Sequence, residues 1–190
     1  MVKRCEWADN NALMKEYHDK EWGTPEHDDK ILHELLILEG MQAGLSWNTI
    51  LQKRDNFRKA FDNFDYIRIS NYAELKIEEL MQNKGIIRNR LKIQSVISNA
   101  KSFIKIREEF GSFDNYIWGF VNNKVVHNSW KALEELPSNT ELSDRISKDL
   151  KRRGFKFVGS TIIYSFLQAV GIVNDHTTYC FRDSELKNKA

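Results

Sequence analysis

The sequence predicts an all-α protein. Of its 190 residues only two are Pro and nine are Gly, too few for the many tight turns of an all-β fold, while Leu, Ile, Lys and Glu are plentiful. Apolar residues also recur at helical spacing along most of the chain. The apolar content of 41% is ordinary for a globular protein, so the chain suits one domain, residues 1–190, or two small lobes that share a core.

The first part of the chain predicts three helices. One is expected over residues 9–21, where apolar side chains recur at helical spacing. Asp28 or Asp29 can cap a second helix, which runs to about Gln42. Ser46 can cap the third helix, because its hydroxyl accepts a hydrogen bond from a free amide of the first turn.

Residues 76–109 predict a helical hairpin. A short helix is followed by a turn that contains Gly85, and a long helix begins at Arg88. The amides at the start of the second helix would point outward, where the helix dipole helps them to hold a phosphate. The basic residues expected around that point are Lys84, Arg88, Arg90 and Lys92. The alternative is an ordinary pair of connected helices with a solvated basic face.

The second half predicts three more helices, over residues 113–121, 141–153 and 160–170. The last of them is almost wholly apolar, so we expect it to be the central buried helix. Residues 124–138 suggest a loop with one helical turn, and a final turn holds His176 and Cys180. The polar tail after Phe181 is expected to fray.

A carboxylate, Glu39, lies at the end of the apolar second helix, just before a break at Gly44. A Glu beside the apolar face of a helix has no packing use unless it faces a pocket or solvent. Trp47 follows eight residues later. A carboxylate and an indole that converge on one cavity can hold a planar, hydrogen-bonding, cationic ring. The alternative is an exposed Glu39 with Trp47 in the core.

The two cysteines, Cys5 and Cys180, lie near opposite ends of the chain. His176 and Cys180 are four residues apart, so on a helical turn they share a face. If the termini meet, Cys5 and His18 complete a tetrahedral zinc site without an open position, which would make the metal structural. The alternative is two buried free thiols with unrelated histidines. Three further histidines are not expected to be ligands: His27, His33 and His127.

The charge balance neither demands nor excludes DNA. The formal net charge is only +2, so a nucleic-acid role requires local basic patches. The amino terminus carries charges where a signal peptide needs an apolar run, and no uninterrupted apolar stretch of about 18 residues occurs. We therefore expect a cytoplasmic protein with no membrane partner.

Several short strings follow one another in a distinctive order over nearly the whole chain. They are Cys5-Glu6-Trp7, Tyr17-His18-Asp19 with Glu21-Trp22-Gly23, Leu38-Glu39-Gly40 through Gln42-Ala43-Gly44-Leu45-Ser46-Trp47, Gly85-Ile86-Ile87-Arg88, Trp118-Gly119-Phe120-Val121-Asn122, Arg153-Gly154-Phe155-Lys156-Phe157-Val158-Gly159 and Gly171-Ile172-Val173-Asn174-Asp175-His176. In this order the strings resemble the DNA-3-methyladenine glycosylase I family, bacterial enzymes of the helix-hairpin-helix glycosylase superfamily that remove 3-methyladenine.

The resemblance implies a fold and a set of site residues. It implies two helical lobes around a DNA-binding cleft, a helix-hairpin-helix at about 76–109, and one structural zinc ion, which joins the termini. The implied zinc ligands are Cys5, His18, His176 and Cys180. Glu39 would recognise the flipped base in a pocket lined by Trp47, Tyr17, Trp22 and Trp7. The implied residues at the opened duplex are Gln42, Ala43, Gly44 and Leu45.

One departure from the family concerns the pocket. The family usually has a Tyr where this chain has Met14, and a methionine packs against a ring but donates no hydroxyl hydrogen bond. The departure keeps open a glycosylase for other alkylated bases.

The implied activity is the hydrolysis of the N-glycosidic bond of 3-methyladenine in double-stranded DNA, by a monomer. N3 alkylation gives the base a positive charge, which an aromatic pocket and a carboxylate favour over neutral adenine. We expect Glu39 to bind the base and water to be the nucleophile. No lysine stands out as a Schiff-base nucleophile, so we expect no strand cleavage. Two rival hypotheses are a non-catalytic helix-hairpin-helix DNA-binding module and a zinc hydrolase.

Overall fold

The computed structural model describes residues 2–188, which are mostly helical, as predicted. Ten α-helices occur in this part of the chain: α1 (Ala12–Lys20), α2 (Asp29–Gln42), α3 (Trp47–Ala60), α4 (Tyr66–Ser70), α5 (Glu74–Gln82), α6 (Arg90–Phe110), α7 (Phe113–Gly119), α8 (Glu141–Arg152), α9 (Ser160–Ala169) and α10 (Phe181–Lys187). Short 3-10 helices cover Glu6–Asn10, Asp62–Phe64 and Leu133–Glu135. Two short strands, β1 (Val126–His127) and β2 (Val173–Asn174), pair in parallel, and the sequence did not predict them.

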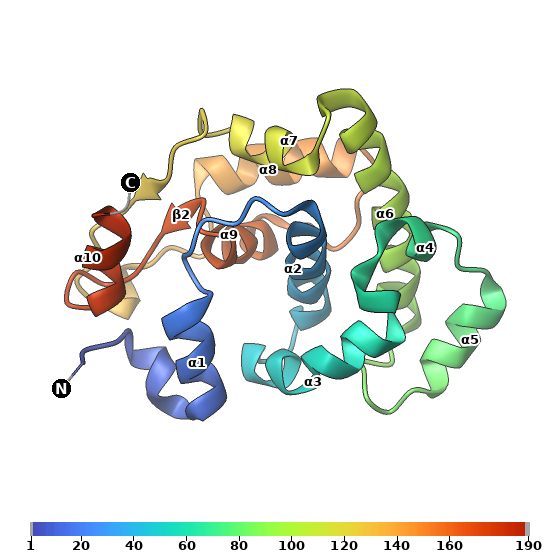
Figure 1. Cartoon of the computed structure of the whole chain (residues 1–190), viewed down its shortest axis with the longest axis horizontal. Coiled ribbons are helices and arrows are strands. Elements are labelled where there is room, and N and C mark those ends of the chain that lie inside the picture. Colours follow the sequence, from blue (N-terminus) through green and yellow to red (C-terminus); the bar gives the residue numbers. More distant parts are fainter. Residues whose placement is uncertain (1, 189–190) are drawn as a thin grey trace.

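Helix α2 lies at the centre of the fold (Figure 1). It begins after Asp28, whose carboxylate accepts hydrogen bonds from the amides of Lys30 and Ile31 at 2.8 and 3.1 Å. Every residue from 32 to 41 is buried. Its Leu32, Leu35 and Leu36 belong to a core shared with α7, α8 and α9. Its Ile37, Leu38 and Met41 belong to a second core, shared with α3, α5 and α6.

The position of α2 differs from the prediction that the 160–170 helix is central. Helix α9 is well buried and contributes to the first of these cores, whereas α2 takes part in both, as does the long helix α6. A helix enclosed from two sides has no single apolar stripe, so amphipathic spacing is a weak guide to its environment.

Three element boundaries also differ from the prediction. The long helix begins at Arg90 and not at Arg88, because Asn89 is its cap and accepts a hydrogen bond from the amide of Lys92 at 3.1 Å. The tail after Cys180 forms α10, with Leu186 buried, where fraying was expected. His176 and Cys180 lie in an extended segment and a turn, and not on a helical turn.

The two ends of the described chain meet. Helices α1 and α10 lie at the same end of the molecule (Figure 1), and the amide of Phe181 donates to the carbonyl of Lys3 at 3.0 Å. Strand pairing brings residues 126–127 beside 173–174 on the same side. No helix among residues 2–188 is long and apolar enough to cross a membrane.

Candidate functional site

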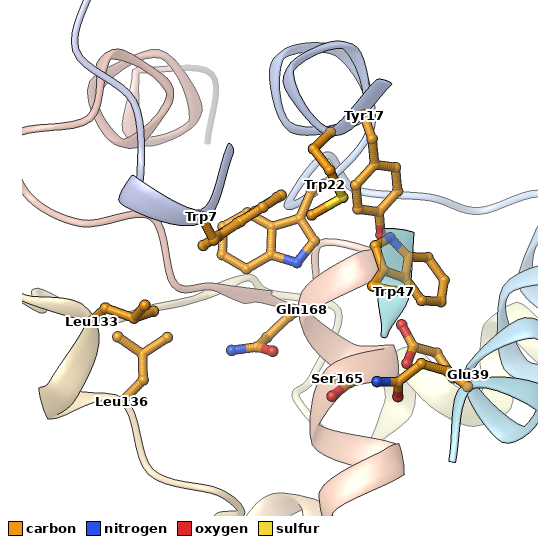
Figure 2. Close-up of a pocket in the computed structure, with 11 residues that line it drawn as sticks. Trp7, Tyr17, Trp22, Glu39, Trp47, Leu133, Leu136, Ser165 and Gln168 are labelled. Carbon is orange, nitrogen blue, oxygen red and sulfur yellow. The ribbon is translucent and has the colours of Figure 1, made fainter. Parts of the chain in front are cut away.

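A cavity of about 340 Å³ opens between α1, α2, α3 and α9. That volume is at the lower end of the range for small-molecule pockets. The cavity is lined by Trp7, Met14, Tyr17, Trp22, Glu39, Gln42, Trp47, Leu133, Leu136, Ser165 and Gln168. Figure 2 shows Glu39 and Trp47 at one end of the cavity and Leu133 and Leu136 at the other. The cavity therefore has a polar end and an apolar end.

Glu39 supplies the acidic group of the polar end. It lies in the last turn of α2 and is only 4% exposed. This burial excludes the alternative of a solvent-exposed Glu39. Burial raises the pKa of its carboxyl to about 8, and no hydrogen bond or ion pair from the described part of the chain offsets that effect. A buried carboxylate without a partner is costly in free energy. An ionised Glu39 would thus be stabilised by a ligand that brings hydrogen-bond donors or a positive charge.

Aromatic rings surround this carboxylate. The ring centroids of Tyr17 and Trp47 are 5.4 Å apart, and those of Trp7 and Trp22 are 5.0 Å apart in an edge-to-face arrangement. The indole N–H of Trp47 is buried without a hydrogen-bond partner among the described residues. Burial, and next the charge of Glu39, raise the pKa of Tyr17, which keeps its hydroxyl protonated. The polar end thus offers flat apolar surface together with unpaired hydrogen-bonding groups.

Met14 lies in the cavity wall and is 7% exposed. The amide of Met14 donates to the side chain of Asn11, the cap of α1, at 3.0 Å, which fixes where the helix begins. Its thioether adds apolar surface beside the tryptophans and no hydroxyl.

Four cavity residues were not predicted: Leu133, Leu136, Ser165 and Gln168. The two leucines belong to the 124–138 segment, which has no clear periodicity, so nothing in the sequence places them. Ser165 and Gln168 are three residues apart in the otherwise apolar α9 and therefore share a face. Two polar side chains at that spacing were a usable signal for a pocket.

The buried carboxylate of Asp175 holds the apolar end in place. It accepts hydrogen bonds from Asn128 at 2.6 Å and from the Trp130 indole at 2.7 Å, which fasten the segment that leads to Leu133. It also accepts from Gln168 at 2.7 Å and from the Tyr164 hydroxyl, both on α9. One carboxylate thus ties two walls of the cavity together.

The turn after α2 is exposed at Gly44 and Leu45, close to the cavity. Gly44 has a φ of +78°, in the left-handed region that favours glycine, and no atom lies within 4 Å of where a Cβ would be. Leu45 is 39% exposed, and its carbonyl accepts a hydrogen bond from the Gln42 side chain at 2.9 Å. Residues 43–45 therefore form a turn beside the cavity that a hydrogen bond from Gln42 stabilises and that is exposed at its tip.

The predicted hairpin is present as α5, a turn and α6. Gly85 lies in that turn, where its amide donates to the Asn83 side chain at 2.8 Å, and Arg88 is exposed. Two of the four basic residues expected to face a phosphate do not. Arg90 is paired with Glu74 and Glu78 of α5, and Lys92 is buried. Lys84 and Arg88 remain at the surface.

A second cluster lies behind the aromatic wall of the cavity. The side chains of Cys5, His18, His176 and Cys180 are all buried, and their ligand atoms lie within 4.8 Å of one another. Sulfur-to-nitrogen distances are 3.5 Å for Cys5 to His176, 3.4 Å for Cys180 to His18 and 3.5 Å for Cys180 to His176. Zinc bonds of about 2.3 Å to sulfur and 2.0–2.1 Å to nitrogen put tetrahedral S and N ligands about 3.5 Å apart. The four residues can therefore hold a metal ion.

The second nitrogen of each histidine supports this arrangement. Nδ1 of His18 is 2.8 Å from the carboxylate of Asp19, and Nε2 of His176 is 3.0 Å from the carbonyl of Trp22. A ligating histidine usually donates its other N–H to a carboxylate or carbonyl, which fixes the tautomer. Nε2 of His18 and Nδ1 of His176 are thereby left to face the two sulfurs.

Comparison with known proteins agrees with this geometry. The sequence pattern of the family described as methyladenine glycosylase matches residues 7–183. The chain is 47% identical to DNA-3-methyladenine glycosylase 1 of Escherichia coli (strain K12) over 179 residues, which are 94% of this chain and 96% of that protein. A crystal structure of a 3-methyladenine DNA glycosylase I has a TM-score of 0.92 at 49% identity, covering 94% of this chain and 98% of that one. Another such glycosylase, a variant solved in complex with 3-methyladenine, has a TM-score of 0.92 at 32% identity and covers 95% and 97% of the two chains.

The fold and the cavity define a helical protein with an aromatic-lined cavity that contains a buried carboxylate. The chain belongs to the methyladenine glycosylase family.

Proposed function

We propose that this protein is a monofunctional DNA glycosylase that flips 3-methyladenine out of double-stranded DNA and hydrolyses its N-glycosidic bond. The observation that carries the proposal is Glu39, a buried carboxylate in an aromatic cavity with no partner among the residues that the structure describes. The names of the relatives supply the substrate, because they are 3-methyladenine glycosylases and one was solved with 3-methyladenine.

The charge of the lesion explains how the cavity selects it. N3 methylation makes the base cationic and weakens the glycosidic bond, so the leaving group needs little activation. The face of an aromatic ring attracts a cation, by up to about 2 kcal/mol where water is excluded. The rings that would supply this attraction are those of Trp47, Tyr17, Trp22 and Trp7. A cation next to Glu39 also lowers its raised pKa, so that the carboxylate ionises as the base binds. Neutral adenine gains neither contribution.

Glu39 acts in this proposal as a binding and electrostatic residue, and water is the nucleophile. Lys92 is a buried lysine whose pKa is lowered by burial, which are properties of a Schiff-base nucleophile. It does not line the cavity, and its ammonium group is bound to backbone carbonyls at the C-terminal end of α2. Hydrolysis without strand cleavage is therefore the expected reaction.

The DNA contacts are assigned to two surface elements of one domain, residues 1–190. The exposed turn Ala43–Gly44–Leu45, with Gln42 beside it, would fill the space that the flipped base leaves in the duplex. The hairpin, which as a helix-hairpin-helix covers about 76–109, would approach the DNA backbone at Gly85 and bind it through the charge of Arg88. Exposure of Leu45 and Arg88 supports both assignments.

We assign one structural Zn²⁺ to Cys5, His18, His176 and Cys180. Four protein ligands leave no open position, so the ion would stabilise the join between the termini and take no part in the reaction. That reading argues against the zinc hydrolase. The protein would act as a monomer in the cytoplasm, where thiols stay reduced and DNA is accessible.

Base release from N3-methylated duplex DNA tests the proposal directly. Wild type is expected to release 3-methyladenine, and Glu39→Gln to do so about 10- to 100-fold more slowly, because a hydrogen bond to a charged group contributes about 1.5–3 kcal/mol. Glu108→Gln, an exposed carboxylate on α6, is the matched control. Binding to DNA without release of any base would support the non-catalytic module. Release of other alkylated bases in preference would reassign the lesion.

A further inference from the structure

Lys92 occupies an unusual position in the first turn of α6. It is 6% exposed, and its ammonium group donates to the carbonyls of Met41 at 2.8 Å and Ala43 at 2.7 Å. Burial lowers its pKa, and no carboxylate contributes to that shift. Burying an ammonium against neutral groups alone costs free energy. We therefore expect Lys92 to make an interaction that an apolar side chain such as leucine could not make.

The two carbonyls belong to the end of the central helix. The last carbonyls of a helix have no intrahelical partner, and the helix dipole makes that end negative. At the C-terminus of α2, the ammonium group of Lys92 donates hydrogen bonds to free carbonyls and places a positive charge at the negative end of the dipole. Met41 and Ala43 also flank Gln42, which lines the cavity, and Ala43 leads into the left-handed Gly44. The ammonium group therefore fixes the start of the exposed 43–45 turn.

The backbone of the same residue belongs to the hairpin. The amide of Lys92 donates to the side chain of Asn89, the cap that ends the hairpin turn after Arg88, at 3.1 Å. Lys92 thus connects the hairpin to the turn beside the cavity. Its amide is bound to the hairpin, and its ammonium group is bound to the start of the 43–45 turn.

We propose that Lys92 is a positioning residue that sets the 43–45 turn in register with the hairpin. When the hairpin binds the DNA backbone, the turn then lies where the base leaves the stack. The inference rests on the proposed function, since it assumes that the turn enters the duplex. Lys92 acts through Met41 and Ala43 and does not touch the base.

The proposal predicts a defect that depends on how hard the base is to extrude. Extruding a paired nucleotide costs a few kcal/mol, and less when it is already unpaired. A correctly placed 43–45 turn therefore matters most when the nucleotide is paired. A merely structural role for Lys92 would lower excision equally on both kinds of substrate.

The test compares two duplexes in single-turnover excision, one with 3-methyladenine opposite thymine and one with it opposite an abasic site. Lys92→Met should lower the excision rate by about tenfold or more on the first and by less than about threefold on the second, in line with the extrusion cost. Affinity for free 3-methyladenine, followed by tryptophan fluorescence, should change less than about threefold, since Lys92 does not line the cavity. Lys101→Met, an exposed lysine on the same helix, is the control.

Three results separate the possibilities. An equal loss on both duplexes, or no loss on either, would overturn the role of Lys92 while leaving the proposed function intact. Failure of the wild type to release the base would instead overturn the proposed function. If Lys92→Met does not fold, Asn89→Ala decides the matter: it removes the hydrogen bond to the Lys92 amide from an exposed position and should show the same dependence on the opposite base, to a smaller degree.

Discussion

The aromatic cavity and the cysteine–histidine cluster are adjacent and differ in whether their polar atoms have partners. In the cluster, each imidazole places one nitrogen on a sulfur and the other on a protein acceptor. In the cavity, the Glu39 carboxylate and the Trp47 indole N–H have no partner within residues 2–188. Buried polar groups are normally satisfied, so the unpaired groups that line the cavity are available to a ligand. The paired groups of the cluster lie at spacings at which four ligands can hold a metal ion.

The two regions nevertheless share their walls. Tyr17 and His18 are neighbours on α1, one facing the cavity and the other the cluster. The Trp22 ring lines the cavity while its carbonyl is bonded to His176. Gly23 comes so close that a Cβ there would lie 2.9 Å from the His176 ring. The cluster therefore holds the aromatic wall of the pocket in position.

The largest effect is expected from breaking the cluster. Cys180→Ala should abolish the binding of one zinc ion and lower the free energy of unfolding by several kcal/mol, because metal binding by a site formed only on folding is folding free energy. Metal content and thermal unfolding with and without a chelator measure both. His27→Ala, outside the cluster, should bind zinc like the wild type. A wild type that holds no zinc and ignores the chelator would contradict the structural site.

The next effect concerns the unpaired carboxylate. Burial raises the pKa of Glu39 from 4.5 to about 8, so between these pH values the folded protein holds a proton that the unfolded chain has lost. The contribution of Glu39 to stability is therefore largest below pH 4.5, falls as the pH rises to about 8, and is constant above that. Gln does not ionise. As the pH rises through the same window, the free energy of unfolding of Glu39→Gln should therefore increase relative to that of wild type, by an amount on the order of a few kcal/mol.

Urea unfolding of both proteins at pH 5 and pH 8.5 checks this expectation. A stability difference that does not change with pH would mean that Glu39 has a partner in the folded protein, and the contrast between the two regions would be lost. The same series with Glu108→Gln shows how much of the change belongs to any exposed carboxylate.

The smallest effect is expected at Trp47. Trp47→Phe keeps a ring for stacking and removes an indole N–H that has no partner, so the free energy of unfolding should stay within about 1 kcal/mol of wild type. If the N–H binds the base, affinity for 3-methyladenine should fall by about tenfold, the value of one hydrogen bond. Chemical unfolding and fluorescence titration measure the two quantities. A marked loss of stability would show that the N–H has a structural partner.

Much of the local structure follows from short-range rules in the sequence. The caps Asp28 and Ser46 begin helices as predicted, because a side-chain oxygen next to free amides is a local arrangement. The ligand set of the cluster was proposed from residue types and from the chemistry of zinc. The reason given for one pair was wrong, since His176 and Cys180 meet through a turn and not on a helix.

Tertiary structure decided which local features became a site. Nothing in the periodicity shows that α2 is enclosed by two cores, that Lys92 turns inward to the end of that helix, or that Leu133 and Leu136 close the cavity. Burial and the pKa of Glu39 depend on these long-range contacts, because desolvation is set by all the groups around a carboxylate. The sequence by itself determined the helices, their caps and the residue types available for chemistry. Packing alone determined which of these groups would be buried, paired or left for a ligand.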